Sequence, residues 1–156
     1  MKFALNGALT IGTLDGANVE MRDSVGAENF FIFGNTTPQV ADIRASGYQP
    51  RDIYEANPEL QRVLDSVRDG AFSPAEPARY QQIFDALVSW GDHYLLLADY
   101  ASYIEAQEEV DALYRDPDAW TRMAILNVAG MGAFSSDRTI AQYAHEIWKT
   151  RPVMLS

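Results

Sequence analysis

The chain has 156 residues, about the size of one ordinary domain, and its hydrophobic content of 47% is enough to build a core. Its formal net charge of −10 argues against a nucleic-acid surface and against attraction to an anionic membrane, because both need clustered Lys and Arg. The sequence contains no cysteine, which excludes disulfides and thiolate metal sites and fits a cytoplasmic protein.

Residues 1–34 carry the strand signals of the chain. Leu9–Ile11 and Phe30–Phe33 are short apolar runs, each closed by a glycine, and they predict two β-strands. Ala17–Val25 lies between them and predicts a short helix that also ends at a glycine. The order strand, helix, strand indicates a βαβ unit with a right-handed crossover and two parallel strands.

Both predicted strands are apolar on both faces, which is typical of parallel strands covered by helices on each side. Two strands do not make a stable parallel sheet, and almost nothing but helix is expected after Gly34. We therefore expect the missing strands to lie upstream of Met1, so that the sequence is a piece of a larger α/β fold. The open sheet should leave unpaired strand edges, which favour self-association.

Residues 35–156 are predicted to be largely helical. No linker rich in Gly, Ser or Pro divides the chain, so residues 1–156 are expected to form a single unit. Several helices should begin at a capping residue followed by proline. These starts are Thr37-Pro38, Asn57-Pro58 and Asp116-Pro117.

Two regions of this helical part are less regular. Tyr94–Leu97 could be a strand or a buried helix, because periodicity cannot decide for a run this short. A helix is predicted from about Asp99 to Tyr114, with its aromatic and aliphatic residues inward and its carboxylates outward. Near the N-terminus, Lys2–Asn6 reads as the end of a helix that Gly7 terminates.

Few side chains offer catalytic or metal-binding chemistry. His93 and His145 are about 50 positions apart and have no metal-ligand spacing between them, so no metal site is predicted. Four carboxylates in one helix could supply a pair for acid–base catalysis, but a solvated helix face is the simpler interpretation. The four residues are Glu105, Glu108, Glu109 and Asp111.

Lys2 is the remaining candidate for chemistry. Gly7, Gly12 and Gly16 do not satisfy the Gly-x-Gly-x-x-Gly fingerprint of a dinucleotide site. A lysine beside an initiator methionine is ordinarily a solvated charge, so the residue pattern gives Lys2 no role of its own. Pattern alone therefore leads to a cytoplasmic α/β piece with an unfinished sheet.

Longer segments resemble a known family. Met1–Met21 closely resembles the segment of glycogen phosphorylases around their cofactor lysine. Four other segments look like the C-terminal part of the same family, and the resemblance runs from Met1 to about Trp148. They are Asn29–Gly34, Asp99-Tyr100, Trp120–Arg122 and Phe134–Ile140.

The resemblance implies a glycosyltransferase that uses inorganic phosphate to release glucose 1-phosphate from α-1,4-glucans. It implies a GT-B fold of two Rossmann-like domains, with this chain in the C-terminal part of the cofactor-binding domain. It also implies that pyridoxal phosphate is bound through a Schiff base at Lys2. In this family the phosphate of the cofactor is thought to transfer the proton, so Lys2 would anchor and orient the cofactor.

The chain departs from the family by what it lacks. The glycine-rich loop that presents backbone N–H groups to phosphate would precede Met1, as would the glucan-binding domain. No complete catalytic site is therefore expected, and the isolated chain should be inactive and bind pyridoxal phosphate weakly. The alternatives are a non-catalytic interaction module that docks through its open sheet edge, or a small acidic helical domain in which Lys2 has no function.

Overall fold

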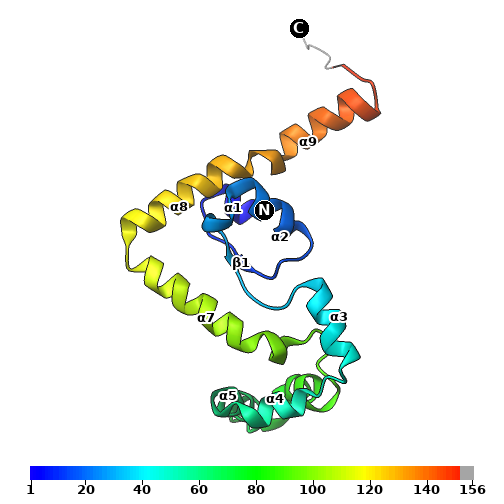
Figure 1. The fold of residues 1–156 in the computed structure, drawn as a ribbon, viewed down its shortest axis with the longest axis vertical. Helices are drawn as coiled ribbons and strands as arrows, with labels where there is room; N and C mark the ends of the chain where they lie inside the picture. The colour runs from blue at the N-terminus through cyan, green and yellow to red at the C-terminus, as the bar shows by residue number, and fades with distance from the viewer. Residues whose placement is uncertain (152–156) are drawn as a thin grey trace. The chain divides into compact units, whose positions relative to one another are not determined.

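The computed structural model describes residues 1–151, shown as a ribbon in Figure 1. The backbone contacts group these residues into two compact units. Unit 1 comprises residues 1–11, residues 16–31 and the described residues from Val110 onward. Unit 2 comprises residues 12–15 and 32–109. The expectation that residues 1–156 form a single unit, with parts 1–34 and 35–156, stays a prediction.

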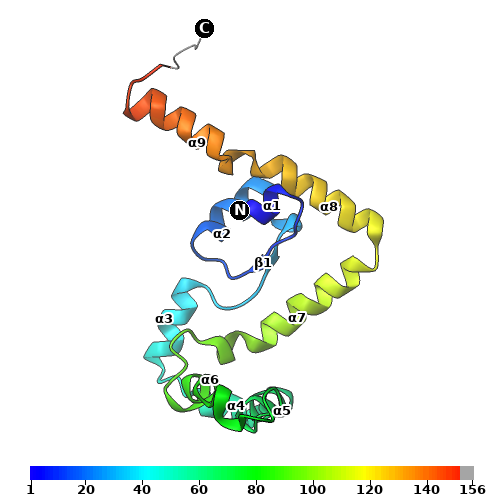
Figure 2. The ribbon, with the colours of Figure 1, turned by 180° about the vertical axis from the view of Figure 1, so that it is seen from behind.

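Unit 1 is built from short helices around one longer helix. Figures 1 and 2 show α1 and α2 beside α8, and both helices contact α8. The turn that follows α8, Met131–Phe134, contacts α1 and α2 as well. The helices are α1 (Lys2–Leu5), α2 (Ala17–Val25), α8 (Pro117–Gly130) and α9 (Ser136–Gln142), and a π-helical turn, Tyr143–Ile147, continues α9.

Close backbone contact between α8 and α2 organises this unit. A Cβ atom added to Gly130 would lie 2.6 Å from the carbonyl oxygen of Ser24 and 2.9 Å from Cα of Val25, both too close. Glycine is therefore required where the end of α8 crosses the end of α2. The adjoining Met131 is completely buried, so the same crossing forms part of the apolar core of unit 1.

The predicted βαβ segment is present, with very short strands. β1 (Ile11–Gly12) pairs with β2 (Phe31–Ile32), and α2 lies between them in the sequence. The N–H of Phe31 donates to the C=O of Thr10 at 3.0 Å, and the N–H of Phe33 donates to the C=O of Gly12 at 3.2 Å. Donor and acceptor advance together along the chain, so the two strands are parallel, as predicted.

The helix between the strands has the bounds that the sequence predicts, and the strands do not. β1 begins two residues later than predicted and each strand has only two residues, because pairing stops where the chain turns after Gly12 and at Gly34. The observed fold is mostly helical with a short parallel two-stranded sheet, which agrees with the predicted α/β class.

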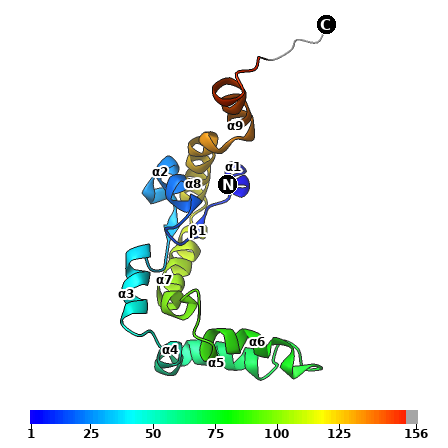
Figure 3. The same ribbon diagram turned by 90° about the vertical axis from the view of Figure 1, so that its right-hand side faces the viewer.

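Unit 2 is a helical layer followed by the start of a long helix. Figure 3 shows α4, α5 and α6 gathered together, and α5 contacts both α4 and α6. The helices are α3 (Thr37–Ala45), α4 (Pro50–Ala56), α5 (Pro58–Arg68), α6 (Gln81–Phe84), which continues as a π-helical turn Asp85–Ser89, and α7 (Leu96–Tyr114), which begins in this unit.

One hydrophobic cluster holds these helices together. The rings of Tyr54 and Phe84 meet edge to face with centroids 5.7 Å apart. Within α5, Leu60 and Leu64 are buried, whereas Val63 is 48% exposed. The buried cluster consists of Tyr54, Leu60, Leu64, Phe84, Val88 and Leu97.

The capping signals that precede proline are confirmed at two of three helices. Asn57 accepts hydrogen bonds from two backbone N–H groups at 3.1 Å, and Asp116 accepts one at 3.0 Å. The third prediction is wrong by one residue: Thr36, and not Thr37, caps α3 through a capping box with Gln39. Thr36 has the extended backbone that a cap requires, and Thr37 is already helical.

Neither alternative for Tyr94–Leu97 holds over the whole run. The chain makes a turn at Asp92–Leu95, where Asp92 and Leu95 both have positive φ angles of 45° and 57°. α7 begins directly afterwards at Leu96, three residues earlier than predicted, and it ends at Tyr114 as predicted. No part of this run forms a strand.

Candidate functional site

Lys2 begins the first helix of unit 1, and its side chain is exposed. The side-chain amide of Asn6 donates to the backbone carbonyl of Lys2 at 2.7 Å, which closes the single turn of α1. Gly7 ends the helix with a φ angle of +87°, in the left-handed region that glycine adopts without strain. The predicted helix end at Gly7 is therefore confirmed, and Lys2 lies at the opposite end of that turn.

Contacts with α8 hold the Lys2 turn in place. Ala4 is only 2% exposed, and α1 contacts α8 and the turn after it. On the other side of the turn, a Cβ atom at Gly7 would lie 3.8 Å from Cγ2 of Val128, which is ordinary van der Waals contact. The backbone that carries Lys2 is thus positioned by a helix more than one hundred residues away in the sequence.

The residues around Lys2 fit the attachment of pyridoxal phosphate only in part. An exposed primary amine is the group that an aldehyde needs, and Lys2 provides it. Four hollows in the described surface are lined by other residues, and α1 is too short to offer a helix N-terminus to a phosphate group. The described residues supply an accessible amine without an enclosure around it, so they do not by themselves fit a complete cofactor site.

The two histidines belong to different units. His145 is exposed on the helical turn after α9. His93 is exposed in unit 2, where its ring meets that of Tyr94 edge to face at 5.0 Å and its backbone carbonyl accepts a 2.8 Å hydrogen bond from Arg44. Within the part of the chain that the structure describes, no group of three or more His, Cys, Asp or Glu side chains could hold a metal ion.

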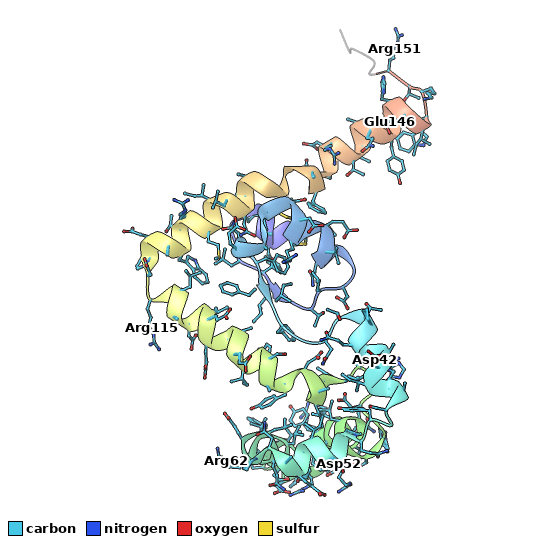
Figure 4. All side chains as sticks on the ribbon, viewed as in Figure 1. Asp42, Asp52, Arg62, Arg115, Glu146 and Arg151 are labelled. Carbon is cyan, nitrogen blue, oxygen red and sulfur yellow. The ribbon has the colours of Figure 1, made fainter. Side chains whose placement is uncertain are left out.

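The acidic cluster of α7 is a solvated helix face. All four carboxylate residues of the cluster, Glu105, Glu108, Glu109 and Asp111, are exposed. Figure 4 shows labelled charges of unit 2, Asp52 and Arg62, directed away from their helices in the same manner. The interpretation as a catalytic carboxylate pair is not supported by any of these positions.

Asp92 is a buried carboxylate that the sequence does not single out. It is 1% exposed and accepts hydrogen bonds from the Tyr48 hydroxyl at 2.8 Å and from the backbone N–H groups of Leu96 at 2.9 Å and Leu97 at 2.8 Å. These N–H groups open α7, where helix N–H groups lack partners within the helix and the helix dipole favours an anion. In the sequence, the only sign that Asp92 caps a helix is that a carboxylate stands just before an apolar run.

The surroundings of Asp92 explain its chemistry. Burial, together with the hydrogen bond to Asp92, raises the pKa of Tyr48 above its usual range, so this phenol stays protonated and donates. Arg44, Gln49 and His93 join these two residues in lining a hollow of about 400 Å³. Since every oxygen of the carboxylate is already hydrogen bonded, Asp92 stabilises the start of α7 and is not a free acid or base.

Two of the segments with a family resemblance meet in unit 2. The Asp99 carboxylate accepts hydrogen bonds from the backbone N–H of Asn35 at 2.8 Å and from its side chain at 2.7 Å. The N–H of Gly34 donates to the Ser102 hydroxyl at 2.8 Å. The end of β2 is thereby fixed to α7, which accounts for polar residues at these positions by structure alone.

Comparison with known proteins places these features in a family context. Residues 1–150 match the carbohydrate phosphorylase family. The chain is 52% identical over 155 residues to a glycogen phosphorylase of Synechocystis sp., which covers 99% of this chain and 18% of that protein. It is 52% identical over 153 residues to a glycogen phosphorylase of Pasteurella multocida (98% and 19%) and 51% identical over 152 residues to the muscle form of Homo sapiens (97% and 18%). The chain thus spans about a fifth of the length of these curated relatives.

Proposed function

Because the chain belongs to the carbohydrate phosphorylase family, we propose that it is part of the cofactor-binding, Rossmann-like half of a cytoplasmic GT-B glycogen phosphorylase. The reaction of the whole enzyme would be phosphorolysis of α-1,4-glucan to glucose 1-phosphate. The observation that carries this proposal is identity of about 50% with relatives named glycogen phosphorylase, sustained over 97–99% of the chain. None of the helices formed by residues 1–151 has both the length and the apolarity that a membrane crossing needs.

Within this function, we assign Lys2 the anchoring of pyridoxal phosphate. Its amine is accessible, and its backbone is held by a packed turn and not by a free tail. The cofactor supplies the acid–base chemistry, and the protein holds it in place. Lys2 therefore contributes orientation, and loss of its amine should abolish turnover even when glucan and phosphate still bind.

A segment exchange tests the proposal. The matched 155 residues of the Synechocystis phosphorylase, with which the chain is 52% identical, would be replaced by this chain. We expect the hybrid enzyme to release glucose 1-phosphate from glycogen. After borohydride reduction, its cofactor should be recovered on the peptide that contains Lys2. A hybrid that folds and has no phosphorylase activity would contradict the proposed function.

The sequence offers a matched control for Lys2. Lys149 is the only other lysine of the chain and is also exposed. Lys2→Arg keeps the charge but cannot form the imine, and it should lower hybrid activity by at least a factor of about 100, the low end of the cost of losing one catalytic interaction. Lys149→Arg should retain full activity. Equal losses in the two variants would show that Lys2 has no special role.

The isolated 156-residue chain should behave differently from the hybrid. Phosphorolysis requires glucan, phosphate and cofactor to be aligned, and the described residues build no such enclosure. We expect no glucose 1-phosphate above a blank. Reduction with pyridoxal phosphate should label Lys2, Lys149 and the N-terminal amine of Met1 together, because an α-amino group is neutral at lower pH than a lysine. Stoichiometric labelling confined to Lys2 would overturn this expectation.

Self-association of the isolated chain is also part of the proposal. The sheet has two strands, and large apolar side chains of unit 1 are exposed, among them Phe3 at 84%. Exposed apolar surface and open strand edges favour association. We expect dimers or larger species by light scattering at tens of micromolar, roughly the range where such surface begins to matter. A clean monomer would contradict this expectation.

A further inference from the structure

Asn127 is a polar side chain in the centre of unit 1. It lies on α8 and is 0% exposed. Its amide nitrogen donates to the backbone carbonyl of Asn29 at 2.8 Å and to the carbonyl of Met123, one helical turn back, at 3.1 Å. Because both neighbours are carbonyl oxygens, they fix which side of the amide carries the nitrogen.

The oxygen of the same amide is not satisfied in this way. Oδ1 of Asn127 is buried and accepts no hydrogen bond from any described residue. Burial of an unpaired polar atom is unfavourable, and an apolar side chain of the same shape would avoid it. Packing alone thus gives no reason for an amide here, and the role of Asn127 lies in what its nitrogen holds.

The Asn29 carbonyl links Asn127 to the strand pair. Asn29 ends the 3₁₀ turn Ala27–Asn29, two residues before Phe31, which donates its N–H to Thr10. Thr10 lies five residues after the end of α1, and between them the N–H of Ala8 donates to the carbonyl of Phe3 within α1. Three hydrogen bonds, separated by short stretches of backbone, therefore connect Asn127 through Phe31 and Thr10 to α1.

The second connection from Asn127 to Lys2 runs along α8 itself. Val128, the next residue, is the one that Gly7 approaches, and α1 packs on α8 through the buried Ala4. The Lys2 turn is thus held by α8 directly and by the strand pair, and the bond from Asn127 to Asn29 joins these two supports. It adds a specific polar contact to the packing of α8 against the 3₁₀ turn Ala27–Asn29.

We propose that Asn127 is a positioning residue for Lys2, acting through its hydrogen bond to the Asn29 carbonyl. Asn127 does not touch the Lys2 amine; it sets where the backbone of the Lys2 turn lies. The inference rests on the proposed anchoring role of Lys2 for its functional meaning. Its physical content, a bond that holds the Lys2 turn, can be tested without any cofactor.

Amide hydrogen exchange of the 156-residue chain measures how often the hydrogen bonds of the Lys2 turn open. Asn127→Leu removes both donors at similar volume, and the amides of Leu5, Asn6 and Gly7, which close the turn, should exchange at least about fivefold faster, as expected for loss of one ordinary hydrogen bond. The matched control is Asn57→Leu, which removes the N-cap of α5 in unit 2 and should leave the exchange rates of these three amides unchanged.

Asn127→Asp separates the hydrogen bond from simple packing. A protonated carboxylic acid keeps one O–H donor, whereas an ionised one has none. Burial raises the pKa of a carboxyl group, so the variant should match the native exchange rate at low pH and become faster as the carboxyl ionises. In Asn127→Leu, the exchange rate of the same amides should exceed the native rate by the same factor at every pH. If the Asp and Leu variants behave alike at all pH values, or if neither loosens the turn, the proposal is wrong.

The hybrid enzyme then separates this inference from the proposed function. If the unsubstituted hybrid is not labelled at Lys2 after reduction, the proposed function fails, and the positioning role toward the cofactor fails with it. If the unsubstituted hybrid is labelled, Asn127→Leu should slow the rate of labelling at Lys2 at least about fivefold, in line with the loosened turn. Labelling at the native rate would overturn the inference and leave the proposed function intact.

Discussion

The two units of the chain are assembled in opposite ways. Unit 2 is nearly continuous in sequence, and the six residues of its buried cluster all lie between Tyr54 and Leu97. Unit 1 joins residues from the start of the chain to residues after Val110, and its central hydrogen bond spans 98 positions. Lys2 therefore lies in the unit whose structure depends on segments far apart in the sequence. Contacts of this kind form only after a long loop has closed, which costs chain entropy.

The buried polar residues of the two units follow the same division. Asp92 in unit 2 accepts three hydrogen bonds, two of them from residues four and five positions away. Asn127 in unit 1 holds a distant carbonyl and leaves its own oxygen without a described donor. Asp92 is thus held mainly by residues close in the sequence, whereas Asn127 holds a residue 98 positions away.

The largest expected effect tests the local core of unit 2. Phe84→Ala should lower the free energy of unfolding by about 3–5 kcal/mol, since it leaves a cavity beside the Tyr54 ring. The measurement is urea unfolding followed by tyrosine and tryptophan fluorescence. Val63→Ala, at a position 48% exposed on the neighbouring helix, is the control and should cost less than about 1 kcal/mol. Similar costs for the two variants would show that the cluster is not a core.

A second prediction concerns the buried carboxylate of the same unit. Asp92→Ala leaves the Tyr48 hydroxyl and two helix N–H groups unpaired, and it should cost about 3 kcal/mol or more. Asp92→Asn keeps one acceptor oxygen and should cost less. Urea midpoints of the two variants and the native chain decide the order. If Asp92→Asn lowers the free energy of unfolding as much as Asp92→Ala does, the hydrogen bonds to the oxygen that asparagine lacks account for the whole effect.

The contact between α8 and α2 gives the corresponding prediction for unit 1. Gly130→Ala places a methyl group 2.6 Å from the Ser24 carbonyl, which should cost about 1–3 kcal/mol through displacement of the helix. Gly132→Ala is the matched control, because a Cβ atom there meets nothing within 4 Å. The rate of amide hydrogen exchange in α2 should rise in Gly130→Ala and not in Gly132→Ala. Unchanged exchange in Gly130→Ala would weaken the idea that unit 1 depends on this crossing.

The smallest expected effect is a charge pair on the surface of unit 2. The side-chain hydrogen bond from Arg68 lowers the pKa of the Asp69 carboxyl below its ordinary value. A carboxyl whose pKa is lower in the folded state stabilises the protein above its ordinary pKa, and this contribution is lost as the pH falls through the folded value. Asp69→Asn should therefore lower the melting temperature slightly at pH 7 and leave it unchanged at about pH 2. A loss of equal size at both pH values would exclude the charge pair as the cause.

Local signals in the sequence predict local structure well. The bounds of α2 follow from an apolar run between glycines, and the cap at Asn57 follows from an amide before proline. The parallel pairing of β1 and β2 is also predicted, because two short apolar runs flank a helix. The end of the first helix at Gly7 belongs to the same group.

Structure that depends on distant residues or on unusual backbone angles could not be predicted. The turn before α7 needs positive φ angles at Asp92 and Leu95. Neither residue is a glycine, so the sequence gives no sign of these angles. The burial of Asn127 depends on a partner 98 residues away, so its sequence neighbours give no sign of it. The one-residue error at Thr37 arose because two consecutive threonines offer equal capping chemistry.

The 98-residue span between Asn29 and Asn127 has a consequence for biosynthesis. A ribosome adds about 5–20 residues per second, so the segment that carries Lys2 is exposed for roughly 5–20 s before α8 is synthesised. During that interval Phe30 and Phe31, which are buried in the folded chain, can be bound by a chaperone. The buried cluster of unit 2 lies within 44 residues, from Tyr54 to Leu97. Unit 2 can therefore fold before α8 is available to pack against the Lys2 segment.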